Sequence, residues 1–112
     1  MKDTGQVYFT HMRLHDDEGN IYPNGGVTIA FTFEEKENTG VINYAVAICS
    51  KFDGFEKRQG RVKSAGRLKS PHHAKAFQVN KDITVHDAVS WLRSNVIWST
   101  KVKAALDVDN LY

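Results

Sequence analysis

The chain has 112 residues, of which 15 are Lys or Arg and 13 are Asp or Glu, so its formal net charge is +2. One domain usually holds about 100 to 200 residues, so this length excludes a large multidomain enzyme and predicts a single domain over residues 1–112. The one cysteine, Cys49, cannot form an internal disulfide, and no run approaches the roughly 18 to 20 apolar residues of a membrane span. We therefore expect a cytoplasmic protein without membrane contact.

The first half of the chain predicts three β-strands. Residues 6–14 favour a strand that ends in the polar turn 15–20. The Tyr-Pro-Asn-Gly-Gly run at 22–26 is expected to break the structure, because proline lacks an N–H donor and glycine permits positive φ. From Val27 to Glu34 apolar residues alternate, which predicts a half-buried strand with Val27, Ile29, Phe31 and Phe33 on one face.

The segment from Val41 to Cys49 predicts the second strand of a hairpin with Val27–Glu34. Its apolar face carries Ile42, Tyr44, Val46 and Ile48. The opposite face carries side chains that are small enough for another element to pack closely against it, namely Ala45, Ala47 and Cys49.

A basic amphipathic helix of about four turns is expected from Phe55 to Lys69, because the periodicity changes there from two to 3.6 residues. On a helical wheel, the inward arc consists of Phe55, Val62, Ala65 and Gly66. The outward arc consists of Lys57, Arg61, Lys63 and Arg67. Gly60 and Gly66 each weaken a helix by about 1 kcal/mol relative to alanine, so we expect them to serve close packing or a bend.

The rest of the chain predicts a short strand followed by helical segments. Residues 75–80 alternate as a strand, and Thr84 is a good helix start before the apolar stripe Val85, Ala88, Val89 and Leu92. Asn95 is expected to interrupt this helix, and Ser99 to begin a last helical piece. The result is an α+β fold in the order β-β-β-α-β-α, with an antiparallel sheet of three to four strands packed against two or three helices.

Charge is distributed unevenly along the chain. Residues 1–50 contain three bases and seven acids, whereas residues 51–75 contain eight bases and only two acids. A local basic patch attracts phosphates or acidic surfaces more strongly than the same charge spread over the whole surface. The electrostatic centre of the sequence is therefore the predicted basic helix.

No catalytic or metal-binding pattern stands out in the sequence. His11, His15, His72 and His73 form neither a CxxC nor an HExxH motif with Cys49 or with one another, so we expect no metal and no cofactor. Cys49 ends an apolar run and is expected to be a buried packing residue, so we predict no enzyme activity. A small hydrolase that uses Cys49 or a histidine stays open as one alternative function.

The segment Phe55–Leu68 has an aromatic residue, a basic pair, Gly-Arg, Ala, and then Gly-Arg-Leu, and it follows a strand that ends at Ser50. This pattern resembles small uncharacterised bacteriophage accessory proteins over roughly residues 44–68. The resemblance implies expression in a bacterial host cytoplasm, and a regulatory role or inhibition of a host enzyme or defence complex such as a CRISPR nuclease. It implies no catalytic residue.

The leading hypothesis is a non-enzymatic phage accessory protein that binds a bacterial host protein or protein–nucleic-acid complex and inhibits or redirects it. The alternative is a regulator that binds nucleic acid directly. Either partner would be contacted by the bases of the predicted helix, which are Lys57, Arg58, Arg61, Lys63, Arg67 and Lys69. The oligomeric state stays open.

Overall fold

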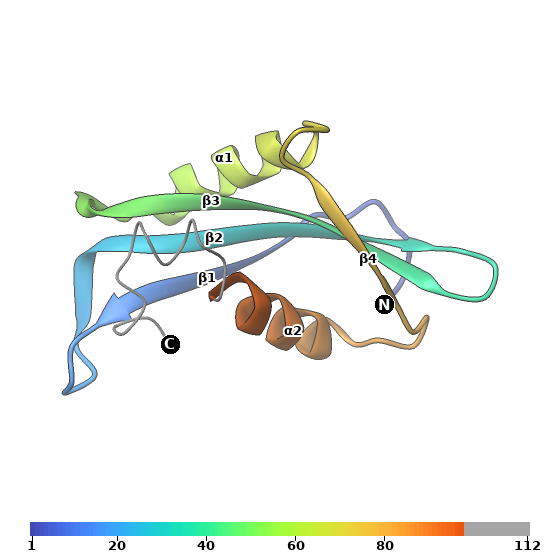
Figure 1. Ribbon diagram of the computed structural model, residues 1–112, viewed down its shortest axis with the longest axis horizontal. Coiled ribbons are helices and arrows are strands. Elements are labelled where there is room, and N and C mark those ends of the chain that lie inside the picture. The colour runs from blue at the N-terminus through green and yellow to red at the C-terminus, as the bar shows by residue number, and fades with distance from the viewer. Residues whose placement is uncertain (98–112) are drawn as a thin grey trace.

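A computed structural model describes residues 1–97. Four strands form one antiparallel sheet, and two helices pack against it (Figure 1). In chain order the elements are β1 (Tyr8–His15), β2 (Ile21–Glu35), β3 (Gly40–Gly54), α1 (Lys57–Leu68), β4 (Lys75–Val79) and α2 (Val85–Ile97). Neighbouring strands in the sheet follow the order β1-β2-β3-β4. The predicted α+β fold and its element order are confirmed.

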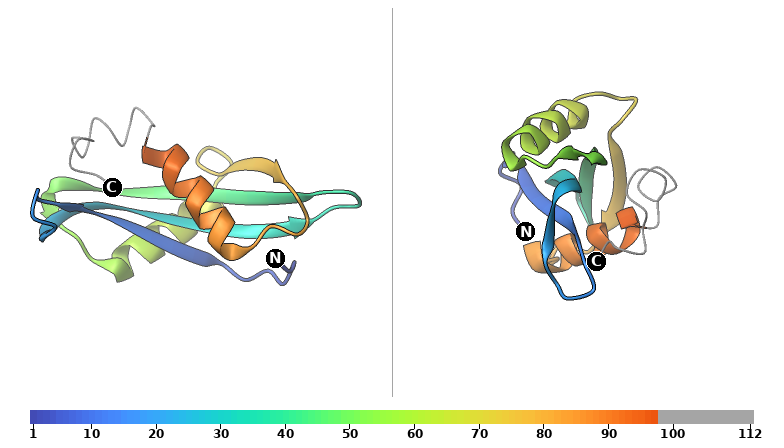
Figure 2. Two further views of the ribbon diagram at one scale, coloured as in Figure 1. Left: turned by 90° about the horizontal axis from the view of Figure 1, so that it is seen from below. Right: turned by 90° about the vertical axis from the view of Figure 1, so that its left-hand side faces the viewer.

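The two helices cover opposite faces of the sheet, as Figures 1 and 2 show. The face toward α2 is the main core, and it contains the predicted apolar face of β2. Thr84 caps α2 as expected, because its Oγ1 accepts a hydrogen bond from the Asp87 N–H at 3.1 Å. From α2 the core receives Ala88, Leu92 and Val96. Val85, which was expected on this stripe, is exposed.

The face toward α1 is lined by small side chains. Thr28 and Ala30 of β2 are fully buried there, and Ala45 and Ala47 of β3 are buried beside them. β2 is thus covered on both faces, and the expectation of a half-buried strand was wrong. The small face of β3 allows α1 to lie close against β2 and β3, as the sequence predicted.

The expected break at residues 22–26 is wrong, because β2 runs through this segment. The strand absorbs the glycines as an irregularity, with a shift of register between Asn24 and Gly26 against β3. Gly25 has a φ of 80°, and a Cβ on Gly26 would come within 2.4 Å of the Phe55 ring. The pair of glycines therefore lets β2 bend and lets Phe55 pack directly on the backbone.

Asn95 does not interrupt α2, which continues to Ile97. Its side-chain amide donates a hydrogen bond to the Trp91 carbonyl at 2.8 Å, so the asparagine is accommodated within the helix. The helical piece expected from Ser99 lies outside the described residues.

Candidate functional site on helix α1

The side of α1 that touches the sheet is made of its smallest residues. A Cβ on Gly60 would lie only 2.1 Å from Thr28 Oγ1, so this glycine permits the close approach. Ser64 is fully buried and donates its hydroxyl to the Gly60 carbonyl at 2.7 Å. The predicted inward arc was wrong in this respect, since Val62 is 68% exposed and Gly66 is exposed. A sheet face of small residues accepts the smallest side of a helix rather than its most apolar side.

The outward side of α1 carries exposed bases, which we call the basic surface: Lys57, Arg58, Arg61, Lys63 and Lys69. Arg58, Val62 and Lys69 are spaced by four and seven residues, so they share one face of the helix. Val62 consequently lies in the middle of the basic surface, with an apolar side chain that the fold does not bury.

Arg67 does not belong to this surface, contrary to the sequence prediction. Its side chain is half-buried, and its Nη1 donates a hydrogen bond to the backbone carbonyl of Val46 in β3 at 2.9 Å. The guanidinium thus ties the end of α1 to the edge of the sheet. The helical wheel placed Arg67 outward because the wheel was oriented on Val62 and Gly66 instead of Gly60 and Ser64.

Two residues of β1 lie beside the basic surface, and sequence reasoning missed both. Of the two, Arg13 extends the positive charge beyond α1. Arg13 stacks over the Phe55 ring at 4.4 Å and donates a hydrogen bond to the Tyr22 carbonyl at 2.9 Å. His11 shares a 2.8 Å hydrogen bond with Thr28 Oγ1. Both side chains project toward α1, which the alternation of β1 against the buried Met12 could have indicated.

His11 is affected both by burial and by the bases around it. Burial lowers the pKa of His11 from its ordinary value of 6.5, and the neighbouring cations Lys57, Arg61 and Arg13 lower the pKa further. Bases of α1 and β1 therefore act on one another across the gap between the two elements.

Within residues 1–97 the side-chain ion pairs are Lys36 with Glu34 and Lys81 with Glu35, and neither involves α1. The helix also has no acidic residue in its first turn and no side-chain cap from Glu56. Bases at a helix N-terminus are disfavoured by the macrodipole by about 0.3–1 kcal/mol each. Lys57 and Arg58 thus have no ion-pair partner within residues 1–97, and an external anion would relieve the unfavourable interaction with the macrodipole.

Cys49 is half-buried rather than fully buried as expected. Its thiol lies on the α1 side and donates to the carbonyl of Asp53 at 3.3 Å. Across the described part of the chain, no group of three or more His, Cys, Asp or Glu side chains could hold a metal ion. Neither helix of residues 1–97 has the length and apolarity to cross a membrane.

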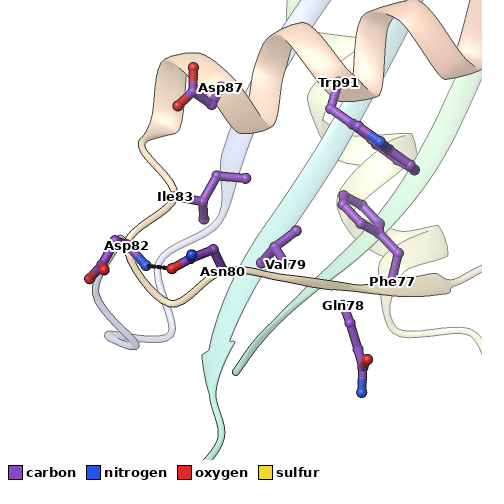
Figure 3. Close-up of a pocket in the computed structure, with 8 residues that line it drawn as sticks. All are labelled: Phe77, Gln78, Val79, Asn80, Asp82, Ile83, Asp87 and Trp91. Atoms are coloured by element: carbon purple, nitrogen blue, oxygen red, sulfur yellow. Dashed lines mark hydrogen bonds between the residues drawn. The ribbon is translucent and has the colours of Figure 1, made fainter. Parts of the chain in front are cut away.

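A separate pocket of about 520 Å³ lies between β4 and α2 (Figure 3). Phe77 and Trp91 line this pocket and stack on each other, with ring centroids 3.7 Å apart. Its polar residues include Asp82 and Asp87, whose negative charge does not suit an anionic partner. This pocket is therefore distinct in chemistry from the basic surface.

Comparison with protein-family models, with curated proteins and with solved structures found no match to this chain.

Proposed function

We propose that the protein is a non-enzymatic accessory protein that binds a bacterial host macromolecule through the basic surface and inhibits or redirects it. The observation that carries this proposal is the set of five exposed bases, four on α1 and one at its C-cap, without an ion-pair partner in residues 1–97. The resemblance of residues 44–68 to phage accessory proteins supports a host target. Such a surface attracts an anionic partner and steers its approach.

An acidic protein surface, alone or within a protein–nucleic-acid complex, fits the basic surface better than a bare phosphate backbone. Val62 is 68% exposed at its centre, and Phe52, near the start of α1, is 80% exposed. Protein interfaces combine a central apolar contact with a charged rim, whereas contacts to phosphates need only charge and hydrogen-bond donors.

Direct binding of nucleic acid is the second candidate. It is favoured by Arg13, which widens the positive region from one helix to two elements. A nucleic-acid partner would make affinity fall steeply with salt, at a slope set by the number of phosphates contacted.

The test is capture from bacterial lysate, with and without nuclease, followed by titration of the purified partner. We expect Arg58→Glu with Arg61→Glu to lower affinity at least about tenfold, because each reversal replaces attraction with repulsion. Arg67 is left intact because it holds the Val46 carbonyl. The matched control is Lys2→Glu with Lys36→Glu, two exposed bases away from α1. Equal affinity of the α1 variant and this control would refute the site.

Val62→Ser distinguishes the two partners, since this exposed position carries no charge and little packing. A protein partner should lose about fivefold or more in affinity when the central apolar contact is removed. A nucleic-acid partner should bind this variant like the wild type, and its capture should be lost on nuclease treatment.

A further inference from the structure

The outer edge of β3 is only partly covered by β4. The two strands pair from Gly40 to Tyr44, whereas β3 continues to Gly54. Within residues 1–97 no strand pairs with this edge beyond Tyr44. The Val46 carbonyl accepts from the Arg67 side chain, and both residues line the cleft beside this edge. Backbone groups of alternate residues face the same side of a strand, so the backbone of Ile48 faces the same side as the Val46 carbonyl.

A cleft of about 440 Å³ lies along this edge, between the C-terminal end of α1 and α2. Its volume falls in the usual range for small-molecule sites, which is about 300–1,000 Å³. Two aromatic side chains line the cleft, Tyr44 from β3 and Trp91 from α2, and their ring centroids are 6.4 Å apart. Trp91 is 39% exposed although one side of its ring is stacked on Phe77.

Apart from Tyr44, the ionisable side chains of the cleft are basic ones. They come from the end of α1, the following loop and the first residue of β4, and they are Arg67, His72, His73 and Lys75. None of the described lining residues is Asp or Glu. This composition contrasts with the neighbouring pocket in Figure 3, which shares Trp91 but contains Asp82 and Asp87.

Several of these groups are held in place before anything binds. The hydrogen bond from Arg67 to the Val46 carbonyl fixes the guanidinium at the edge of the sheet. His73 Nδ1 shares a hydrogen bond of 3.1 Å with Ser70 Oγ, and the Asn95 amide is bonded to the Trp91 carbonyl. Preorganised donors reduce the entropy that is lost when a small anion binds.

We propose that this cleft binds a nucleoside phosphate, either free or as an unpaired nucleotide of a single strand. The base stacks on Trp91, its polar edge meets the free backbone of β3, and the phosphate is held by Lys75 and the histidines. Stacking on an aromatic ring together with cationic contacts to phosphate is the chemistry by which proteins hold unpaired nucleotides. None of the five bases of the basic surface lines the cleft, so this proposal does not depend on the partner of α1.

Isothermal titration calorimetry with AMP, adenosine and inorganic phosphate tests the proposal. We expect AMP to bind at least about tenfold more tightly than either fragment, because only AMP makes both the stacking and the phosphate contact. AMP that binds no more tightly than inorganic phosphate would overturn the proposal and would leave the proposed function of α1 intact. A trideoxyadenylate probe assigns the source: tighter binding than AMP indicates a single strand, and weaker binding indicates a free nucleotide.

The variant Lys75→Gln with His72→Gln changes two exposed side chains of the cleft and should weaken AMP binding about tenfold. Lys2→Gln is the control, an exposed base outside the cleft, and should leave AMP binding unchanged. Trp91→Leu should also weaken binding at least about fivefold through lost stacking. Wild-type affinity in the Lys75 and His72 variant would show that the phosphate is not held here, whether or not the Trp91 variant folds.

Discussion

Protonation of His11 depends on its burial and on the positive charge around α1. Its folded-state pKa lies below 6.5 because of burial and the nearby Lys57, Arg61 and Arg13. The unfolded chain therefore binds a proton at His11 more readily than the folded protein does. It follows that His11 lowers the free energy of unfolding as the pH falls from 6.5 toward the folded pKa. Above this window the histidine is neutral in both states and has no such effect.

Replacing His11 with glutamine should remove this dependence while keeping a hydrogen-bonding group near Thr28. We expect the free energy of unfolding of the wild type to fall more than that of His11→Gln between about pH 7.5 and about pH 5.5. Urea unfolding at the two pH values measures the difference. His72→Gln, which changes an exposed loop residue, is the control. Parallel pH profiles for wild type and His11→Gln would contradict the assignment.

At the scale of single elements, α1 shows which part of a helix can be predicted from sequence. Lys57, Arg61 and Lys63 of the predicted outward arc are exposed as expected, because burying an unpaired charge is costly. The close packing expected of Gly60 is confirmed, but Ser64 was not predicted to face inward, since it carries no apolar signal. Their role follows from the small face of β2 and β3, which is a property of the assembled sheet. Arg67 was predicted to face solvent for the same reason. Its hydrogen bond to a backbone carbonyl of β3 cannot be predicted from the neighbouring sequence.

The two glycines of α1 should respond to alanine in opposite directions. Gly60→Ala should lower the free energy of unfolding by about 1–3 kcal/mol, because its Cβ would overlap Thr28. Gly66→Ala should raise it by about 0.5–1 kcal/mol, since open space surrounds that position and alanine favours the helix. Urea unfolding of both variants checks this. A loss of stability in Gly66→Ala as large as in Gly60→Ala would refute the proposed packing of α1.

For the whole molecule, the order of elements was predictable because hydrophobic periodicity changes between strands and helices along the chain. The prediction was wrong where tertiary contacts override local signals. β2 continues through 22–26 because β3 pairs with it beyond the irregularity, and α2 continues past Asn95 because Val96 is buried in the core. The cleft beside β3 could not be predicted either, since it brings together residues from β3, the end of α1 and α2.

The core between the sheet and α2 should carry most of the stability, because it contains the large apolar side chains. Leu92 is completely buried there, so Leu92→Ala should lower the free energy of unfolding by about 2–5 kcal/mol. Ser94→Ala, at an exposed position of the same helix, should change it by less than about 0.5 kcal/mol. Thermal unfolding followed by circular dichroism compares the variants. Similar midpoints for both would show that α2 contributes little to the core.

The fully buried side chain of α1 is Ser64, and its contact with the sheet depends on a glycine nearby. Substitutions at the outward positions of this helix should therefore change the free energy of unfolding very little. Selection can exchange Arg58, Arg61 or Lys63 one at a time, and the same scaffold then presents a new pattern of charge. Under the proposed function, the charge pattern that meets the partner can therefore change without any change in the interior of the protein.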